Sequence, residues 1–227
     1  TFTITVSDPN TSLSVVNAIV DESIAQDGTY GFTIPGSTFG NPVDGSTITY
    51  SALQSNGQPL PDWLLFNGAT GHFSGTPLNA DVGVVTIVVT ADNETSSITD
   101  TFNLTVTNVN DAPTEANIIT GQTASSTIDY SFEIQPDTFS DIDLAVDSTE
   151  ALTYTAAISY ESGSNWLGFS DGVFSGTPAS GDEGVVTVIL TATDQGSETA
   201  TMTFTITVSD PNTSLSVVNA IVDESIA

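Results

Sequence analysis

Carboxylate and amide side chains recur where the chain passes from one strand-rich stretch to the next. The segment between residues 106 and 113 carries Asn108, Asn110 and Asp111, and Pro113 prevents it from continuing as a regular strand. Ca²⁺ takes about six to eight oxygen ligands from carboxylates, amides and backbone carbonyls, and ligands on flexible segments favour it over Mg²⁺. The sequence predicts a Ca²⁺ site formed by Asp81, Asn108, Asn110, Asp111, Asp141, Asp143 and Asp194.

A second group of acids and amides occupies matching positions next to an adjoining repeat. Asn41 and Asp44 stand where Asp141 and Asp143 occur later in the chain, so we expect the central site to be the better formed of the two. Asp and Asn also favour turns, so solvated turn residues are the alternative interpretation of both groups. The second site is predicted to use Asp8, Asn10, Asp44, Asp92, Asp182, Glu183, Asp210 and Asn212.

Nothing in the sequence indicates catalysis. His72 is the single histidine, and its counterpart in the internal repeat is Val173, on a segment with no signalled nucleophile or acid partner. Pairs of carboxylates could serve a glycosidase, but so many acids make chance pairs common. We predict that the chain is not an enzyme and that His72 is an exposed or half-exposed strand residue.

Two tryptophans sit at equivalent places in apolar clusters. Trp63 is followed by Leu-Leu-Phe and Trp166 by Leu-Gly-Phe. Large aromatic side chains serve more often in core packing than as exposed platforms for sugars, so we favour the core for both. Tyr50 and Tyr160 are the alternative positions for stacking a glycan.

The charge balance restricts the partners of this chain. It has no Lys or Arg, 28 Asp plus Glu, and a formal net charge of -28. Phosphates and anionic lipids require basic residues for binding, so nucleic acids and membrane surfaces are excluded as partners. Cations, neutral glycans and other protein surfaces remain as suitable partners. Cys is absent, so no disulfide supports the fold.

Two levels of repetition organise the chain. Residues 1–25 and 203–227 are the same string, which indicates one period of a longer tandem array continuing into the next. Within that period, Phe73-Ser-Gly75-Thr-Pro77 recurs as Phe174-Ser-Gly176-Thr-Pro178. The period therefore contains two homologous domains of about one hundred residues each.

Alternating apolar residues predict strands throughout both domains. Phe102, Leu104 and Val106 share one face of a strand, as Phe204 and Ile206 do in the second domain. Short strands separated by Gly, Asn, Asp and Pro are typical of a β-sandwich, in which loops gather at the two ends. We predict an all-β chain with the last strand of a preceding repeat at 1–6, seven-strand Ig/cadherin-like sandwiches at 7–106 and 107–208, and the start of another repeat at 209–227.

Several motifs resemble known tandem modules. The Asn108 to Pro113 segment resembles a cadherin linker, and Asp141-x-Asp143 resembles an early cadherin Asp-x-Asp. The stretch from Pro61 to Gly83 is similar to dystroglycan-type cadherin-like modules, also described as putative Ig modules, of giant bacterial surface or secreted proteins. The resemblance covers nearly all of both domains. It implies seven-strand sandwiches with Ca²⁺ between domains and a role in cell adhesion or glycan binding.

These observations predict a structural repeat segment of an extracellular adhesin or filament at the cell surface. Interdomain Ca²⁺ would stiffen the array, and the partners would be neighbouring identical repeats in the same or adjacent chains. The alternative is a carbohydrate- or protein-binding cadherin-like module. A terminal strand that completes the sheet of another chain is a further possibility, since residues 1–6 repeat a strand sequence.

Overall fold

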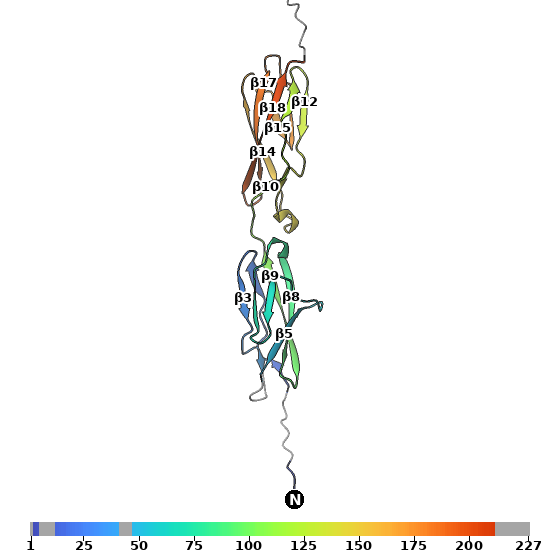
Figure 1. The fold of residues 1–227 in the computed structure, drawn as a ribbon, viewed down its shortest axis with the longest axis vertical. Coiled ribbons are helices and arrows are strands. Elements are labelled where there is room, and N and C mark those ends of the chain that lie inside the picture. Colours follow the sequence, from blue (N-terminus) through green and yellow to red (C-terminus); the bar gives the residue numbers. More distant parts are fainter. Residues whose placement is uncertain (1, 5–11, 41–46, 212–227) are drawn as a thin grey trace, which may run out of the picture. The chain divides into compact units, whose positions relative to one another are not determined.

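The computed structural model describes residues 2–4, 12–40 and 47–211. These residues form two compact units built almost entirely of strands (Figure 1). The first unit contains the described residues up to Asn110 together with Ile142–Thr149. The second contains Asp111–Asp141 and the described residues from Glu150 onward.

The first unit has one four-stranded and one three-stranded main sheet. Their strand orders are β2-β9-β8-β5 and β3-β7-β6, and β1 and β4 form a separate short antiparallel pair. The strands are β1 (Ser14–Val15), β2 (Glu22–Ala25), β3 (Tyr30–Thr33), β4 (Phe39–Gly40), β5 (Thr49–Gln54), β6 (Leu64–Asn67), β7 (His72–Gly75), β8 (Gly83–Asp92) and β9 (Ser97–Thr107).

The second unit repeats this topology. Its main sheets have the orders β11-β18-β17-β14 and β12-β16-β15, with β10 and β13 as the short pair. The strands are β10 (Thr114–Glu115), β11 (Gln122–Ser125), β12 (Tyr130–Glu133), β13 (Phe139–Ser140), β14 (Thr153–Tyr160), β15 (Gly168–Ser170), β16 (Val173–Gly176), β17 (Gly184–Thr193) and β18 (Thr199–Ser209). The predicted all-β sandwich class is confirmed, and the seven strands of the main sheets match the predicted number in each unit.

Period-2 alternation builds the core of each unit. In the first, the side chains of Ile87 and Val89 on β8 and of Leu104 on β9 are completely buried, while the residues between them lie toward the other face. In the second, Val188 on β17 and Ile206 on β18 are equally buried. Alternate side chains of a strand point to opposite faces, so each long strand contributes one row of side chains to the core.

The repeated Phe-Ser-Gly sequence has a packing explanation. A Cβ atom built on Gly75 would lie 2.0 Å from the backbone oxygen of Trp63, and one on Gly176 would lie 2.0 Å from that of Trp166. No side chain fits at either glycine without moving the neighbouring backbone. Glycine therefore allows the strand to approach the tryptophan residue in both units.

Candidate metal centre

Two predicted ligands of the second unit are buried acids at strand ends. Asp141 directly follows β13 and Asp194 directly follows β17, and each side chain is only 6% exposed. The Asp194 Oδ1 atom accepts a hydrogen bond of 2.7 Å from the Glu198 amide, which closes a tight turn. Asp194 thus holds one oxygen atom in a fixed position where the chain leaves β17, and Asp141 is buried directly after β13.

Strand pairing brings the linker close to Asp141. β10 and β13 are antiparallel, with Thr114 opposite Ser140, so the residues before Thr114 run beside the residues after Ser140. Asp111 precedes the first of these strands and Asp141 follows the second. The topology therefore places both acids at one end of the second unit.

Asn79 and Asn108 of the first unit have buried side-chain amide oxygens. Asn79 is 7% exposed, and its Nδ2 donates a 2.9 Å hydrogen bond to the backbone oxygen of Ile142. The Oδ1 atoms of Asn79 and Asn108 are buried and accept no hydrogen bond. Asn108 was a predicted ligand, whereas the sequence did not single out Asn79. A buried amide oxygen without a donor is the kind of ligand that a hard cation takes.

Asp81 and Asp143 also belong to the first unit but differ in exposure. Asp81 ends the short 3₁₀ helix η1 (Asn79–Asp81), and its Oδ2 accepts a 2.9 Å hydrogen bond from the Leu78 amide. Asp143 begins η2 (Asp143–Ala145) and its side chain is 1% exposed. Asp81 has a local structural role besides any binding role. Among the predicted acids that the structure describes, Asp143 is the most deeply buried.

The residues predicted for a second site have varied surroundings. The Asp182 carboxylate accepts hydrogen bonds from the Ser164 amide, the Ala179 amide and the Ser164 hydroxyl, and these bonds hold the pKa of Asp182 below its usual value. Asp92 and Glu183 accept bonds from nearby amides. Asp210 is exposed. Asp8, Asn10, Asp44 and Asn212 lie outside the described residues.

The donor set fits a hard cation chemically. Asp141, Asp143 and Asp194 are buried in a chain that has no Lys or Arg to neutralise them. A buried carboxylate is stable only with compensating hydrogen bonds or a cation. Within residues 2–4, 12–40 and 47–211, no three acidic or histidine side chains are grouped closely enough to hold a metal ion. The predicted ligands are divided between the two units, so their assembly around one ion stays a prediction.

The remaining candidate residues have structural surroundings. The His72 ring is half-buried on β7, with Nδ1 2.8 Å from the Thr33 hydroxyl oxygen, so its predicted place on a strand is confirmed. Trp63 and Trp166 pack against the cores of their units, as predicted. The Tyr160 hydroxyl accepts a 3.0 Å bond from the Leu167 amide, so it is occupied within the fold.

Comparison with known proteins identifies the family. Residues 11–107 and 112–209 each match the family described as Putative Ig domain, so the chain belongs to that family. No curated protein matches the sequence. The part of the chain that the structure describes contains no helix of a length and hydropathy suited to crossing a membrane.

Solved cadherin structures share the fold at low sequence identity. Domains 3–6 of protocadherin gamma B2 are 17% identical with a TM-score of 0.59, and the match covers 88% of this chain and 52% of that one. Drosophila N-cadherin EC1-4 is 16% identical with a TM-score of 0.58, and the match covers 85% and 48% of the two chains. An endo-fucoidan hydrolase of glycoside hydrolase family 107 is 21% identical, with a TM-score of 0.40 and coverage of 91% and 30%. The chain spans about half or less of these proteins, and the cadherin likeness shows an Ig/cadherin-like fold.

Proposed function

We propose that this chain is a structural repeat segment of an extracellular adhesin or filament whose adjacent modules are stiffened by shared Ca²⁺. The modules have no catalytic role in this proposal, and their partners are neighbouring repeats in the same or adjacent chains. The bacterial cell-surface setting is proposed from the resemblance to tandem cadherin-like modules, and a surface of this acidity suits a medium that supplies divalent cations. The tandem Ig-family modules and the sequence identity of residues 1–25 with 203–227 support the repeat role.

Buried carboxylate and amide oxygen atoms carry the calcium part of the proposal. Asp141, Asp143 and Asp194 would supply carboxylates, and Asn79 and Asn108 would supply amide oxygens. When bound, Ca²⁺ would neutralise charge that the chain cannot neutralise itself. The linker is short and ends at Pro113, so an ion held by it and by both modules would restrict their relative movement.

Thermal unfolding in Ca²⁺ and in chelator tests this role. Extracellular Ca²⁺ modules bind Ca²⁺ with dissociation constants of about 10⁻⁴ to 10⁻³ M. A free Ca²⁺ concentration about 100 times the dissociation constant stabilises the folded protein by about 2.7 kcal/mol. We expect Ca²⁺ to raise the melting temperature and to narrow the distribution of chain dimensions measured by X-ray scattering. NaCl at matched ionic strength measures the contribution of charge screening.

Three variants separate binding from screening. Asp141→Asn and Asp143→Asn each remove one charge and one strong ligand, and we expect each to weaken Ca²⁺ affinity at least about tenfold. Asp62→Asn removes the same charge at an exposed position outside the predicted set and serves as the matched control. Equal Ca²⁺ affinity in all three variants would exclude the proposed ligands. An unchanged melting temperature in the unsubstituted chain would exclude stabilisation by Ca²⁺ altogether.

A further inference from the structure

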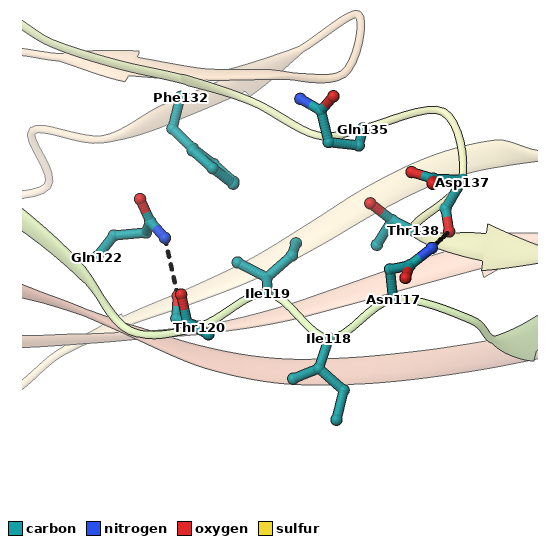
Figure 2. Close-up of a pocket in the computed structure, with 9 residues that line it drawn as sticks. All are labelled: Asn117, Ile118, Ile119, Thr120, Gln122, Phe132, Gln135, Asp137 and Thr138. Carbon is teal, nitrogen blue, oxygen red and sulfur yellow. Dashed lines mark hydrogen bonds between the residues drawn. The ribbon is translucent and has the colours of Figure 1, made fainter.

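The second unit has a small pocket at the side of its sandwich. Figure 2 shows it between the connection from β10 to β11 and the turn from β12 to β13. β11 and β12 belong to different main sheets, so the pocket opens where the two layers separate. Its volume is about 210 Å³, which is smaller than a typical drug-sized site and limits an occupant to about one small ring.

Hydrogen bonds shape the pocket before any ligand arrives. The Asn117 Nδ2 atom donates a 2.8 Å bond to the backbone oxygen of Asp137, which ties the β10–β11 connection to the opposite turn. The Thr138 amide donates to the Gln135 backbone oxygen at 3.0 Å and closes that turn. The Gln122 Nε2 atom donates to the Thr120 oxygen at 2.8 Å, which orients the side-chain amide. A pocket formed in advance costs little ordering on binding.

The pocket is lined by apolar and by polar side chains, which are called its floor and its rim. In Figure 2 the ring of Phe132 and the side chain of Ile119 face the open space, and Ile119 is 9% exposed. The polar lining residues include Gln122 and Gln135, which carry amides, and Asp137, which carries a carboxylate. An aromatic and aliphatic floor suits the C–H face of a sugar ring, while amides and a carboxylate suit hydroxyl groups at its edge.

The negative charge of the chain restricts which sugars the pocket can bind. The chain carries a net charge of -28 with no basic residue, and the pocket itself contains Asp137, so sulfated or acidic sugars are repelled. We propose that this pocket binds one neutral pyranose unit of a glycan through Phe132, Ile119 and the polar rim. The site lies within the second unit alone, so it is independent of Ca²⁺ and of the repeat role.

The first unit supplies an internal comparison. It retains the floor, with Ile19 buried and Phe32 packed against its core. In the aligned sequence its rim differs, because Pro35 and Ser37 replace Gln135 and Asp137, and Glu22 replaces Gln122. The proposed affinity for a sugar therefore belongs to the second unit. The first unit shows that the fold is compatible with its own, different rim residues.

Chemical-shift titration with D-glucose, D-galactose, D-mannose, L-fucose and N-acetyl-D-glucosamine tests the site. The full chain is titrated in chelator up to ~50 mM of each sugar, and a ligand of this size is expected to bind with a dissociation constant of about 1–10 mM. We expect at least one sugar to shift the Ile119 methyl and Thr138 amide resonances. The methyl glycoside of that sugar then shows which form the pocket recognises. Binding that is retained with the methyl glycoside indicates the end of a glycan, and binding that is lost indicates the free monosaccharide.

Rim variants show whether the pocket is responsible. Gln135→Pro and Asp137→Ser introduce residues that the first unit already carries, and together they are expected to weaken binding at least about tenfold with the melting temperature unchanged. Ser37→Ala in the first unit is the matched control and should leave the sugar titration unchanged. The proposal is overturned if no sugar shifts the pocket resonances, if the rim variant binds equally well, or if choline chloride binds more tightly than every sugar.

Discussion

The two units are near copies in their cores but differ in how their loop acids are held. Phe66 and Phe73 have ring centroids 4.3 Å apart in the first unit, and Phe169 and Phe174 are 4.4 Å apart in the second. By contrast, the carboxylate of Asp81 accepts a hydrogen bond from the Leu78 amide, while the carboxylate of Asp182 at the matching position accepts three hydrogen bonds. Close packing keeps the core geometry uniform, whereas the surroundings of the loop acids differ between the units.

The largest expected effect is a matched truncation of the two central phenylalanines. Phe73 and Phe174 are both completely buried at 0% exposure. Replacing either by Ala removes a large side chain and leaves a cavity, so Phe73→Ala and Phe174→Ala should each destabilise their own unit by ~3–5 kcal/mol. Each unit has one tryptophan, so the indole N–H resonances of Trp63 and Trp166 report the unfolding of the two units separately.

The comparison requires each substitution to act on one unit. Phe73→Ala should shift the unfolding midpoint reported by Trp63 and leave that reported by Trp166 in place, and Phe174→Ala should do the reverse. If either variant lowered both midpoints equally, the two units would unfold together and would not be separate modules.

A smaller effect is expected at the paired glycines. A Cβ at Gly75 or Gly176 would overlap a tryptophan backbone oxygen in each unit, and backbone cannot move as easily as a side chain tip. Gly75→Ala and Gly176→Ala should therefore each cost ~1–3 kcal/mol of stability, measured by chemical denaturation. Gly36→Ala is an informative control, because its Cβ would meet nothing within 4 Å and its backbone is not in the left-handed region. A Gly75→Ala variant as stable as the unsubstituted chain would contradict the close contact.

Most of the fold could be predicted because burial imposes a simple pattern on long strands. The alternation along β8 and β9, for example, identifies Ile87 and Leu104 as core residues without any structural information. The repeated motifs then assign the second unit by comparison with the first. The two-residue strands β1, β4, β10 and β13 were not predicted, since a pair of residues carries no measurable period.

The candidate site was only partly predictable. Asp141 was recognisable from its Asp-x-Asp pattern, and Asp194 because it directly follows the apolar strand β17. The structure shows both buried. Asn79 was missed because Asn is common in turns, and only its burial and unpaired Oδ1 distinguish it from a solvated turn residue. Hydrogen bonds such as those to Asp182 depend on distant loops, which a local pattern does not encode.

The smallest effect expected here concerns acid stability and separates Asp182 from Asp81. Hydrogen bonds from Ser164 and Ala179 depress the pKa of Asp182, so the bonded carboxylate stabilises the fold above the usual Asp pKa. This contribution is lost as the pH falls through the depressed folded-state pKa. Asp182→Asn should lower the melting temperature of the second unit at neutral pH. The melting temperature of this variant should then fall less steeply in acid than that of the unsubstituted chain.

Asp81→Asn provides the matched measurement in the first unit. Leu78 donates one amide to Asp81, whereas the loop containing Ser164 adds two further donors to Asp182, so the first unit should change less at neutral pH. Following the Trp63 and Trp166 indole signals through thermal unfolding from about pH 7 to about pH 2 measures both variants in the same way. Equal losses would mean that the two Ser164 bonds contribute nothing, and an Asp182→Asn curve parallel to that of the unsubstituted chain would show that other acids govern acid unfolding of the second unit.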